Sequence, residues 1–135
     1  RNSEIENIIF LATGTGVAPV KSILENVLES SSNFSKKKFW VFIGARYKED
    51  LFWEPKLDDR QIDLKYIPVL SRQENDWTGK KGHVHHVVLE QNINLANAQV
   101  YACGSNEMIQ SAKSILIRNS LKESNFFSDA FVETN

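Results

Sequence analysis

Residues 8–19, Ile-Ile-Phe-Leu-Ala-Thr-Gly-Thr-Gly-Val-Ala-Pro, decide the fold class of this chain. They begin with a continuous apolar run that does not alternate with polar residues, which is typical of a strand buried on both faces of a parallel sheet. Residues 13–16 interrupt this run, and from Val17 to about Ser30 the apolar residues recur at the spacing of one helix face. Pro19 fits because proline is tolerated in the first turn of a helix. The segment therefore predicts a strand, a glycine turn and a helix.

The same alternation continues along the chain. Strand patterns cover 39–44, 64–70, 99–103 and 126–132, helical patterns cover a short stretch around 51–53, 83–91 and 108–121, and a polar loop occupies 71–82. Strands that alternate with helices pair in parallel through right-handed crossovers. The sequence therefore predicts an α/β domain, an open doubly wound parallel sheet of about five strands with helices on both faces, of the Rossmann-like kind.

Composition fits a single domain of ordinary charge. The chain has 135 residues, 41% of them hydrophobic, and 16 Lys and Arg nearly balance 17 Asp and Glu. This balance indicates neither nucleic acid nor a membrane as a partner, and no apolar run approaches the about 20 residues of a membrane-spanning helix. Cys103 is the one cysteine, so an intrachain disulfide is excluded and we expect a cytoplasmic protein. Because the sequence opens with Arg1 rather than Met, we expect it to be part of a longer protein.

The glycine turn predicts an anion site. In an open doubly wound sheet the ligand lies beyond the carboxyl ends of the strands where the strand order reverses, and the first and fourth strands normally flank that point. Both of these predicted strands end in glycine, at 13–16 and at 103–104. Glycine lets backbone amides approach a pyrophosphate, and the following helix offers unpaired N–H groups and the positive end of its dipole. Pro19 stands where G-x-G-x-x-G has its third glycine, so a simple tight connection remains the alternative.

Five motifs in register resemble the ferredoxin–NADP reductase superfamily. Residues 13–19 resemble its pyrophosphate loop, and Cys-Gly-Ser-Asn-Glu-Met at 103–108 resembles its C-G-x-x-x-M nicotinamide motif. Further landmarks are Gly-Ala-Arg at 44–46, Ser-Arg at 71–72 and W-x-G-x-x-G at 77–82. Near the end, Phe127-x-Asp129-Ala130-Phe131 resembles bacterial flavin reductases and the dideoxysugar-pathway reductases named for CDP-6-deoxy-glucoseen. The resemblance spans essentially the whole chain.

By this resemblance the chain is the NAD(P)-binding domain of a flavin-dependent oxidoreductase and binds NADH or NADPH. The pyrophosphate would be held by the glycine turn and the start of the helix, namely Thr13, Gly14, Thr15, Gly16, Val17, Ala18 and Pro19. The adenosine half would lie against residues that follow the second and third strands, namely Gly44, Arg46, Ser71 and Arg72. There a guanidinium stacks on adenine or pairs with phosphate, and a hydroxyl bonds ribose or a 2'-phosphate. We expect NADH because this motif adds no further cation, with Lys80 and Lys81 in the same loop as the competing indication.

The resemblance also implies the redox end of the site. Cys103, followed by Gly104 and Met108, would lie beside the nicotinamide C4, and the sequence supplies no partner that would make its thiol a nucleophile. Phe131 would cover the flavin ring when no nicotinamide is bound, with Phe126 and Phe127 as alternatives for that register. The flavin, FAD or FMN, would be bound by an N-terminal barrel domain of the same polypeptide that this sequence lacks, and electrons would pass on to an acceptor protein. A 2Fe-2S cluster would need four cysteines outside this sequence.

Several alternatives stay open. Histidines at 83, 85 and 86 resemble metal-ligand spacing only loosely, so we expect no metal site, and we expect Trp77 to be turn packing. The chain is alternatively a non-catalytic module that senses the nicotinamide pool, or a domain for a different nucleotide, although Cys103-Gly104 favours chemistry. Among enzymes, a flavin reductase, an iron–sulfur-coupled dideoxysugar reductase and an oxygenase reductase all fit. We expect both glycine motifs to converge at one cleft, with an exposed aromatic patch from 126–131 beside it.

Overall fold

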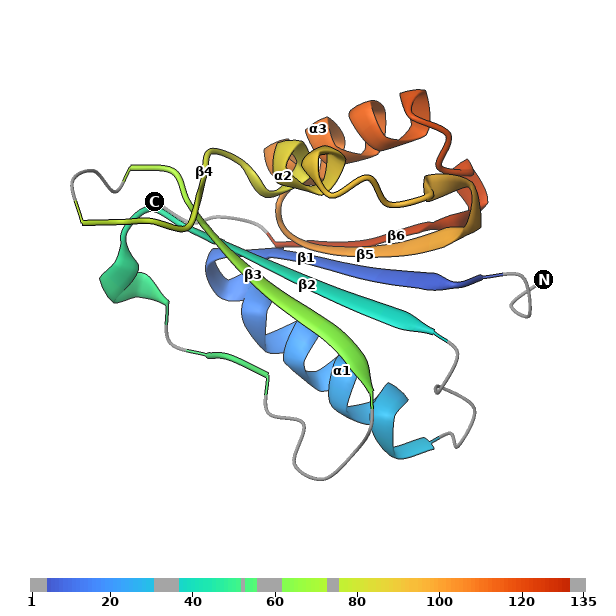
Figure 1. The fold of residues 1–135 in the computed structure, drawn as a ribbon, viewed down its shortest axis with the longest axis horizontal. Coiled ribbons are helices and arrows are strands. Elements are labelled where there is room, and N and C mark those ends of the chain that lie inside the picture. The colour runs from blue at the N-terminus through green and yellow to red at the C-terminus, as the bar shows by residue number, and fades with distance from the viewer. Residues whose placement is uncertain (1–4, 31–36, 52, 56–61, 73–75, 132–135) are drawn as a thin grey trace.

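The computed structural model describes residues 5–30, 37–51, 53–55, 62–72 and 76–131. They form one parallel sheet in the order β4-β3-β2-β1-β5-β6 (Figure 1). The strands are β1 Asn7–Thr13, β2 Lys38–Ala45, β3 Asp63–Leu70, β4 Lys80–Lys81, β5 Ala98–Ser105 and β6 Phe126–Phe131. The chain moves outward from β1 through β2 and β3, and then returns to place β5 on the other side of β1. The strand order therefore reverses between β1 and β5, and the predicted doubly wound α/β fold is confirmed.

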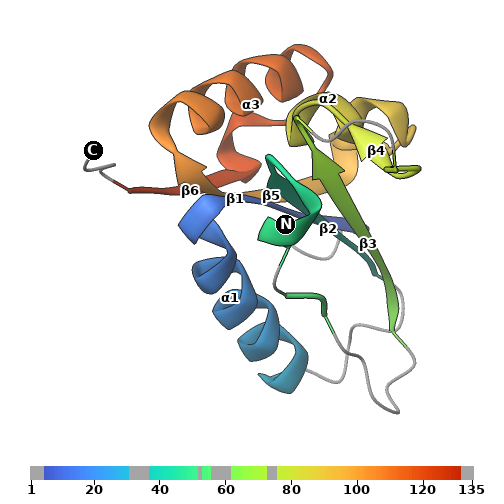
Figure 2. The same cartoon turned by 90° about the vertical axis from the view of Figure 1, so that its left-hand side faces the viewer.

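Three helices cover the two faces of the sheet. They are α1 Val17–Ser30, α2 Val84–Glu90 and α3 Asn106–Arg118. Figures 1 and 2 show α1 on one face and α2 with α3 on the other. Ser105 fixes the start of α3, since its hydroxyl accepts a hydrogen bond from the Met108 amide at 3.2 Å. No helix in the described part of the chain is long and apolar enough to cross a membrane.

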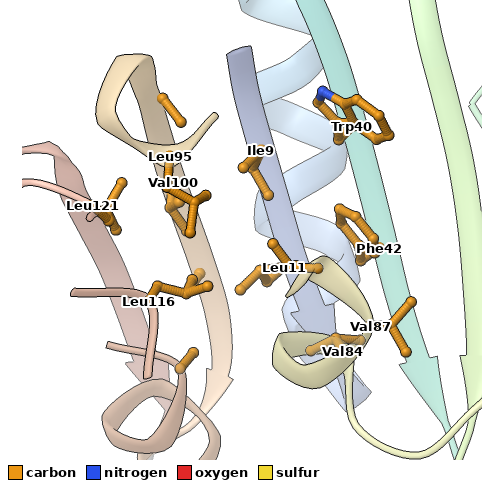
Figure 3. Packing of buried hydrophobic residues seen from close by; sticks show 14 of the residues in the cluster. Ile9, Leu11, Trp40, Phe42, Val84, Val87, Leu95, Val100, Leu116 and Leu121 are labelled. Carbon is orange, nitrogen blue, oxygen red and sulfur yellow. The ribbon is translucent and has the colours of Figure 1, made fainter. Parts of the chain in front are cut away.

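The central strands are buried on both faces, as the unbroken apolar run predicts. On the α2 and α3 face, Ile9 and Leu11 pack with Phe42 among the residues shown in Figure 3. On the α1 face, Phe10 belongs to a second cluster that includes Val20 and Leu24 of α1 together with residues of β2. Each such side chain contributes about 1.5–3 kcal/mol when it is fully buried. The two clusters hold the carboxyl ends of β1, β2 and β5 in fixed positions.

The sheet has six strands, consistent with the predicted number of about five, and the short sixth strand arises because residues 80–81 of the predicted polar loop pair with the end of β3. One sequence-based expectation about the elements is wrong. The helix expected around 51–53 is absent from the described residues, which there contain a three-residue 3-10 turn, Lys48–Asp50. Pro55 disfavours helical backbone in the residue before it, and Leu51 and Trp53 instead pack against the α1-side cluster. Phe52 lies outside the described residues.

The loop around Trp77 follows the expectation of turn packing. Its indole Nε1 donates a hydrogen bond to the Lys80 carbonyl at 2.7 Å. A Cβ on Gly79 would lie 2.5 Å from the indole ring, so glycine lets the ring lie flat on the turn. This arrangement leads the chain into β4 and on to α2.

Candidate functional site

The two glycine motifs meet backbone to backbone. A Cβ on Gly16 would overlap the carbonyl group of Cys103, and a Cβ on Gly104 would overlap Thr13 Oγ1. Both motifs lie at the carboxyl ends of neighbouring strands, with Ala12 of β1 opposite Cys103 of β5. The expected convergence at the carboxyl ends of β1 and β5 is therefore present, and it depends on the absence of side chains at both glycines.

A cavity of about 1490 Å³ lies at this edge of the sheet. Ligand sites commonly occupy about 300–1,000 Å³, so the space exceeds what a small metabolite needs. The predicted residues that line it are Thr13, Gly14, Thr15, Val17, Gly44, Arg46, Ser71 and Met108. The predicted residues that do not line it are Gly16, Ala18, Pro19, Arg72, Cys103 and Gly104. The side chain of Phe131 lies outside the description.

The glycine turn leaves open space on its cavity side. Gly14 has a φ of 56°, and a Cβ placed on it would meet no atom within 4 Å. A Cβ on Gly44 would instead lie 2.9 Å from both Thr13 Cγ2 and Val84 Cγ1. Glycine at position 44 thus lets the ends of β1 and β2 and the start of α2 approach one another. The result is a cradle of backbone amides that begins the 14-residue helix α1.

The adenosine side of the predicted site is held by an extension of the β2–β3 pairing. The Ser71 amide donates to the Ala45 carbonyl at 2.9 Å, and the Arg72 amide donates to the Arg46 carbonyl at 3.0 Å. These bonds place the two predicted arginines opposite each other, yet only Arg46 lines the cavity. Lys80 Nζ lies 3.5 Å from Glu90 Oε1, and neither Lys80 nor Lys81 lines the cavity. Arg46 and Ser71 are the predicted adenosine-side groups that reach the cavity with polar side chains.

The predicted redox end of the site contains a protonated thiol. Cys103 is 1% exposed, and burial, together with the nearby Asp129 carboxylate, raises the pKa of its thiol to about 11. The thiol is therefore neutral near pH 7. Asp129, which the sequence motif includes without a role, is the register partner of Cys103 on β6.

An aromatic row crosses the sheet on the α1 face. The ring centroids of Phe10 and Tyr101 are 5.5 Å apart, and those of Tyr101 and Phe127 are 5.1 Å apart, both stacked. Phe127 is 41% exposed, and residues 128–130 beside it are also exposed. The last strand thus presents an exposed aromatic group at the edge of the sheet, as expected for the 126–131 segment.

Comparison with known proteins identifies the family of this chain. Residues 10–114 match the family model of the oxidoreductase NAD-binding domain. The chain belongs to this family. It is 40% identical over 126 residues to the CDP-6-deoxy-L-threo-D-glycero-4-hexulose-3-dehydrase reductase of Yersinia pestis, covering 93% of this chain and 38% of that protein. It is 33% identical over 133 residues to a probable flavin reductase of Aliivibrio fischeri, covering 96% of this chain and 56% of that protein.

A solved structure shares the fold of this NAD-binding domain. A ferredoxin NADP+ reductase from Neisseria gonorrhoeae with bound FAD and NADP superimposes with a TM-score of 0.73 at 18% identity, over 93% of this chain and 56% of that one. The family match and the relatives named above confirm the resemblance to the ferredoxin–NADP reductase superfamily. The chain spans 38% of the Yersinia protein and 56% of the Aliivibrio protein.

The NAD-binding domain also brings to the cavity residues that sequence analysis left without a role. They are Glu49 and Asp50 of the 3-10 turn, the three histidines at 83, 85 and 86, and a polar stripe of α3 formed by Glu107, Ser111, Ser114 and Arg118. The helical spacing of the α3 stripe is visible in the sequence and marks a polar face. Nothing in the sequence indicates that this face borders the site.

The three histidines lie close to one another in the structure. Among the described residues, no group of three or more His, Cys, Asp or Glu side chains is arranged to hold a metal ion. His85 is 7% exposed, and no described group hydrogen-bonds its buried Nδ1 atom. Burial, and then the neighbouring His86 and His83, lowers the pKa of His85 to about 4. His85 is therefore a neutral side chain near pH 7.

Proposed function

We propose that this domain binds a nicotinamide dinucleotide and positions its nicotinamide for hydride transfer to a flavin held elsewhere in the same polypeptide. The observation that carries the proposal is the contact of Gly16 with the Cys103 backbone, which joins the pyrophosphate loop to the nicotinamide motif at one cavity. The open space above Gly14 and the amides around it suit a pyrophosphate. Family membership supports the same ligand.

Each part of the cavity then has a chemical task. Amides of residues 14–17 bind the pyrophosphate, and Arg46 and Ser71 bind the adenosine half. Met108 packs against Gly104, because a Cβ placed on Gly104 would lie 2.9 Å from Met108 Cε. The bound nicotinamide supplies the hydride. Near it, Cys103 contributes a small neutral thiol, so the protein orients the reactants without forming a covalent bond to them.

We further propose that NADH is the preferred dinucleotide. A 2'-phosphate needs cations, and of the predicted candidates Arg72, Lys80 and Lys81 do not line the cavity. Beside Arg46 the cavity wall instead carries the carboxylates of Glu49 and Asp50. Carboxylates repel a 2'-phosphate and accept hydrogen bonds from a free ribose hydroxyl, which favours NADH.

The flavin domain is proposed to pack beside the end of β6. Phe131 is the register partner of Ser105, a cavity-lining residue, so the end of the last strand lies at the cavity edge. This supports the expected placement of Phe131 near the flavin, with the exposed Phe127 farther along the same strand. The relatives named as a sugar dehydrase reductase and a probable flavin reductase support a reductase that passes electrons to an acceptor, with any 2Fe-2S cluster in another part of the protein. We propose a cytoplasmic location because the sequence contains a single cysteine, Cys103.

Nuclear magnetic resonance of the amide groups tests the proposal. Titration with ADP-ribose should shift the amides of 14–17, Arg46 and Ser71, and titration with NAD+ should additionally shift 103–105. Amides of 95–97, which precede the amino end of β5 and lie outside the cavity lining, serve as the internal control. Shifts confined to the control region, or saturation by neither ligand, would show that the cavity is not a dinucleotide site.

A further inference from the structure

The three histidines of the chain form one cluster on the cavity wall. The sequence contains no other histidine. Ring centroids are 4.4 Å apart for His85 and His86, 5.7 Å for His83 and His85, and 6.0 Å for His83 and His86. All three side chains line the cavity assigned to the dinucleotide. All of the chain's imidazoles therefore belong to this wall.

Packing of α2 brings the cluster close to the glycine turn. Val84 Cγ1 and Thr13 Cγ2 both lie 2.9 Å from the Cβ position of Gly44, so α2 begins where β1 ends. Figure 3 shows Val84 and Val87 against the strands, which fixes α2 on the sheet. The amides of His86 and Val87 bond the His83 carbonyl at 3.1 and 3.2 Å, so His83 is tied to the same turn. The three histidines thus line the same cavity as the glycine turn.

The members of the cluster differ in exposure. His85 is buried, and its low pKa keeps it neutral, so it supports the other two rings without carrying charge. His83 and His86 are exposed on the cavity side of the fold. An anion bound beside an imidazole favours its protonated form.

Because of the other charged groups in the cavity, an anion binds there more favourably when these rings are protonated. Among the described residues, the charged groups that line the cavity are Arg46 and Arg118 against Glu49, Asp50 and Glu107. Lys80, on the strand before the cluster, lies 3.5 Å from Glu90 of α2 and outside the lining. Two arginines do not balance three carboxylates, so the wall is net negative while the histidines are neutral. A pyrophosphate, itself doubly negative, needs additional positive charge there.

We propose that His83 and His86 form a phosphate-binding subsite of the dinucleotide cavity and take up protons when the pyrophosphate binds. This inference rests on the proposed function and adds to it two ligand-binding residues outside the glycine turn. Because the protonated rings attract the anion, affinity decreases as pH rises through the histidine range. Each proton taken up changes the dissociation constant by up to about tenfold per pH unit.

Calorimetric titration with ADP-ribose between about pH 5 and 8 tests this subsite. ADP-ribose carries the pyrophosphate without a 2'-phosphate, and its charge is constant over this range. The heat should differ between two buffers of unequal ionisation enthalpy, because protons are taken up on binding. His83→Gln and His86→Gln should each weaken binding at the acidic end and flatten the pH dependence. Lys81→Gln, which removes a nearby cation outside the cavity lining, should change neither.

A second measurement needs no variant. In the wild-type chain, ADP-ribose should raise the titration midpoints of two of the three histidine ring signals and leave the third neutral. If ADP-ribose binds with the same affinity at every pH and no ring midpoint moves, the subsite is wrong while the dinucleotide site stands. A pH dependence seen only with the 2'-phosphate derivative would also overturn it. Absence of ADP-ribose binding at any pH would overturn the proposed function and the subsite together.

Discussion

Substitution of Gly14 by alanine separates the ligand-binding role of the glycine turn from its folding role. The new Cβ would occupy space that is empty in this structure, so no clash opposes folding. The backbone φ of 56° is left-handed, which costs an L-residue about 1–2 kcal/mol. We therefore expect a folded protein whose melting temperature is lower by about 3–8 °C. The same Cβ faces the proposed pyrophosphate, so affinity for ADP-ribose should fall more than about tenfold, or about 1.4 kcal/mol.

Asn92 supplies a matched control for the backbone strain. It has the same φ of 56° in the turn after α2, and it does not line the cavity. Asn92→Ala should therefore lower the melting temperature while leaving affinity for ADP-ribose unchanged. Thermal unfolding and calorimetric titration of both variants make the comparison. If Gly14→Ala binds ADP-ribose as tightly as Asn92→Ala does, the pyrophosphate is not held at this turn and the reasoning is refuted.

Three further predictions concern other parts of the site. Arg46→Ala should weaken ADP-ribose binding about tenfold or more, whereas Arg72→Ala should change it less than about threefold, as measured by titration; equal losses would contradict the assigned adenosine side. Wild type should also bind ADP-ribose at least as tightly as its 2'-phosphate derivative, and a tenfold preference for the derivative would reject NADH. Because folding raises the pKa of Cys103 to about 11, this thiol should lower stability by about 2–3 kcal/mol as pH rises from about 9 to 11, and Cys103→Ala should reduce the slope in urea unfolding by that contribution.

The sequence predicts the fold well where burial is two-sided. Residues 8–12 are apolar without alternation because both faces of β1 are covered, and the pattern alone indicates that environment. The hydrophobic pattern does not predict β4, because Lys80 and Lys81 are exposed and pair only with the end of β3. This two-residue edge strand consists of lysines, so the sequence contains no hydrophobic pattern that indicates a strand there.

The site is less predictable than the fold. The sequence predicts the same ligand-binding role for Arg46 and Arg72. Their backbones are hydrogen-bonded to each other, yet only Arg46 lines the cavity. The direction of each side chain depends on how the chain leaves β2 and β3, which is decided by tertiary packing. The histidines illustrate the same limit, because their place on the cavity wall follows from the approach of Val84 to Gly44. A motif therefore locates a site without identifying all of its walls.

The two glycines of the turn show how one motif combines different physical requirements. At Gly14 the backbone is left-handed and the Cβ position is empty, so glycine suits the backbone and leaves room for a ligand. At Gly16 a Cβ would overlap the Cys103 carbonyl, so glycine there is required for β1 and β5 to meet. Gly16→Ala must displace backbone rather than a flexible side chain, and it should destabilise the fold by more than Gly14→Ala does. Since relief of that overlap would separate the pyrophosphate loop from Cys103, we expect loss of both stability and nucleotide binding. Nucleotide binding that survives in a destabilised Gly16→Ala protein would show that the two motifs act independently.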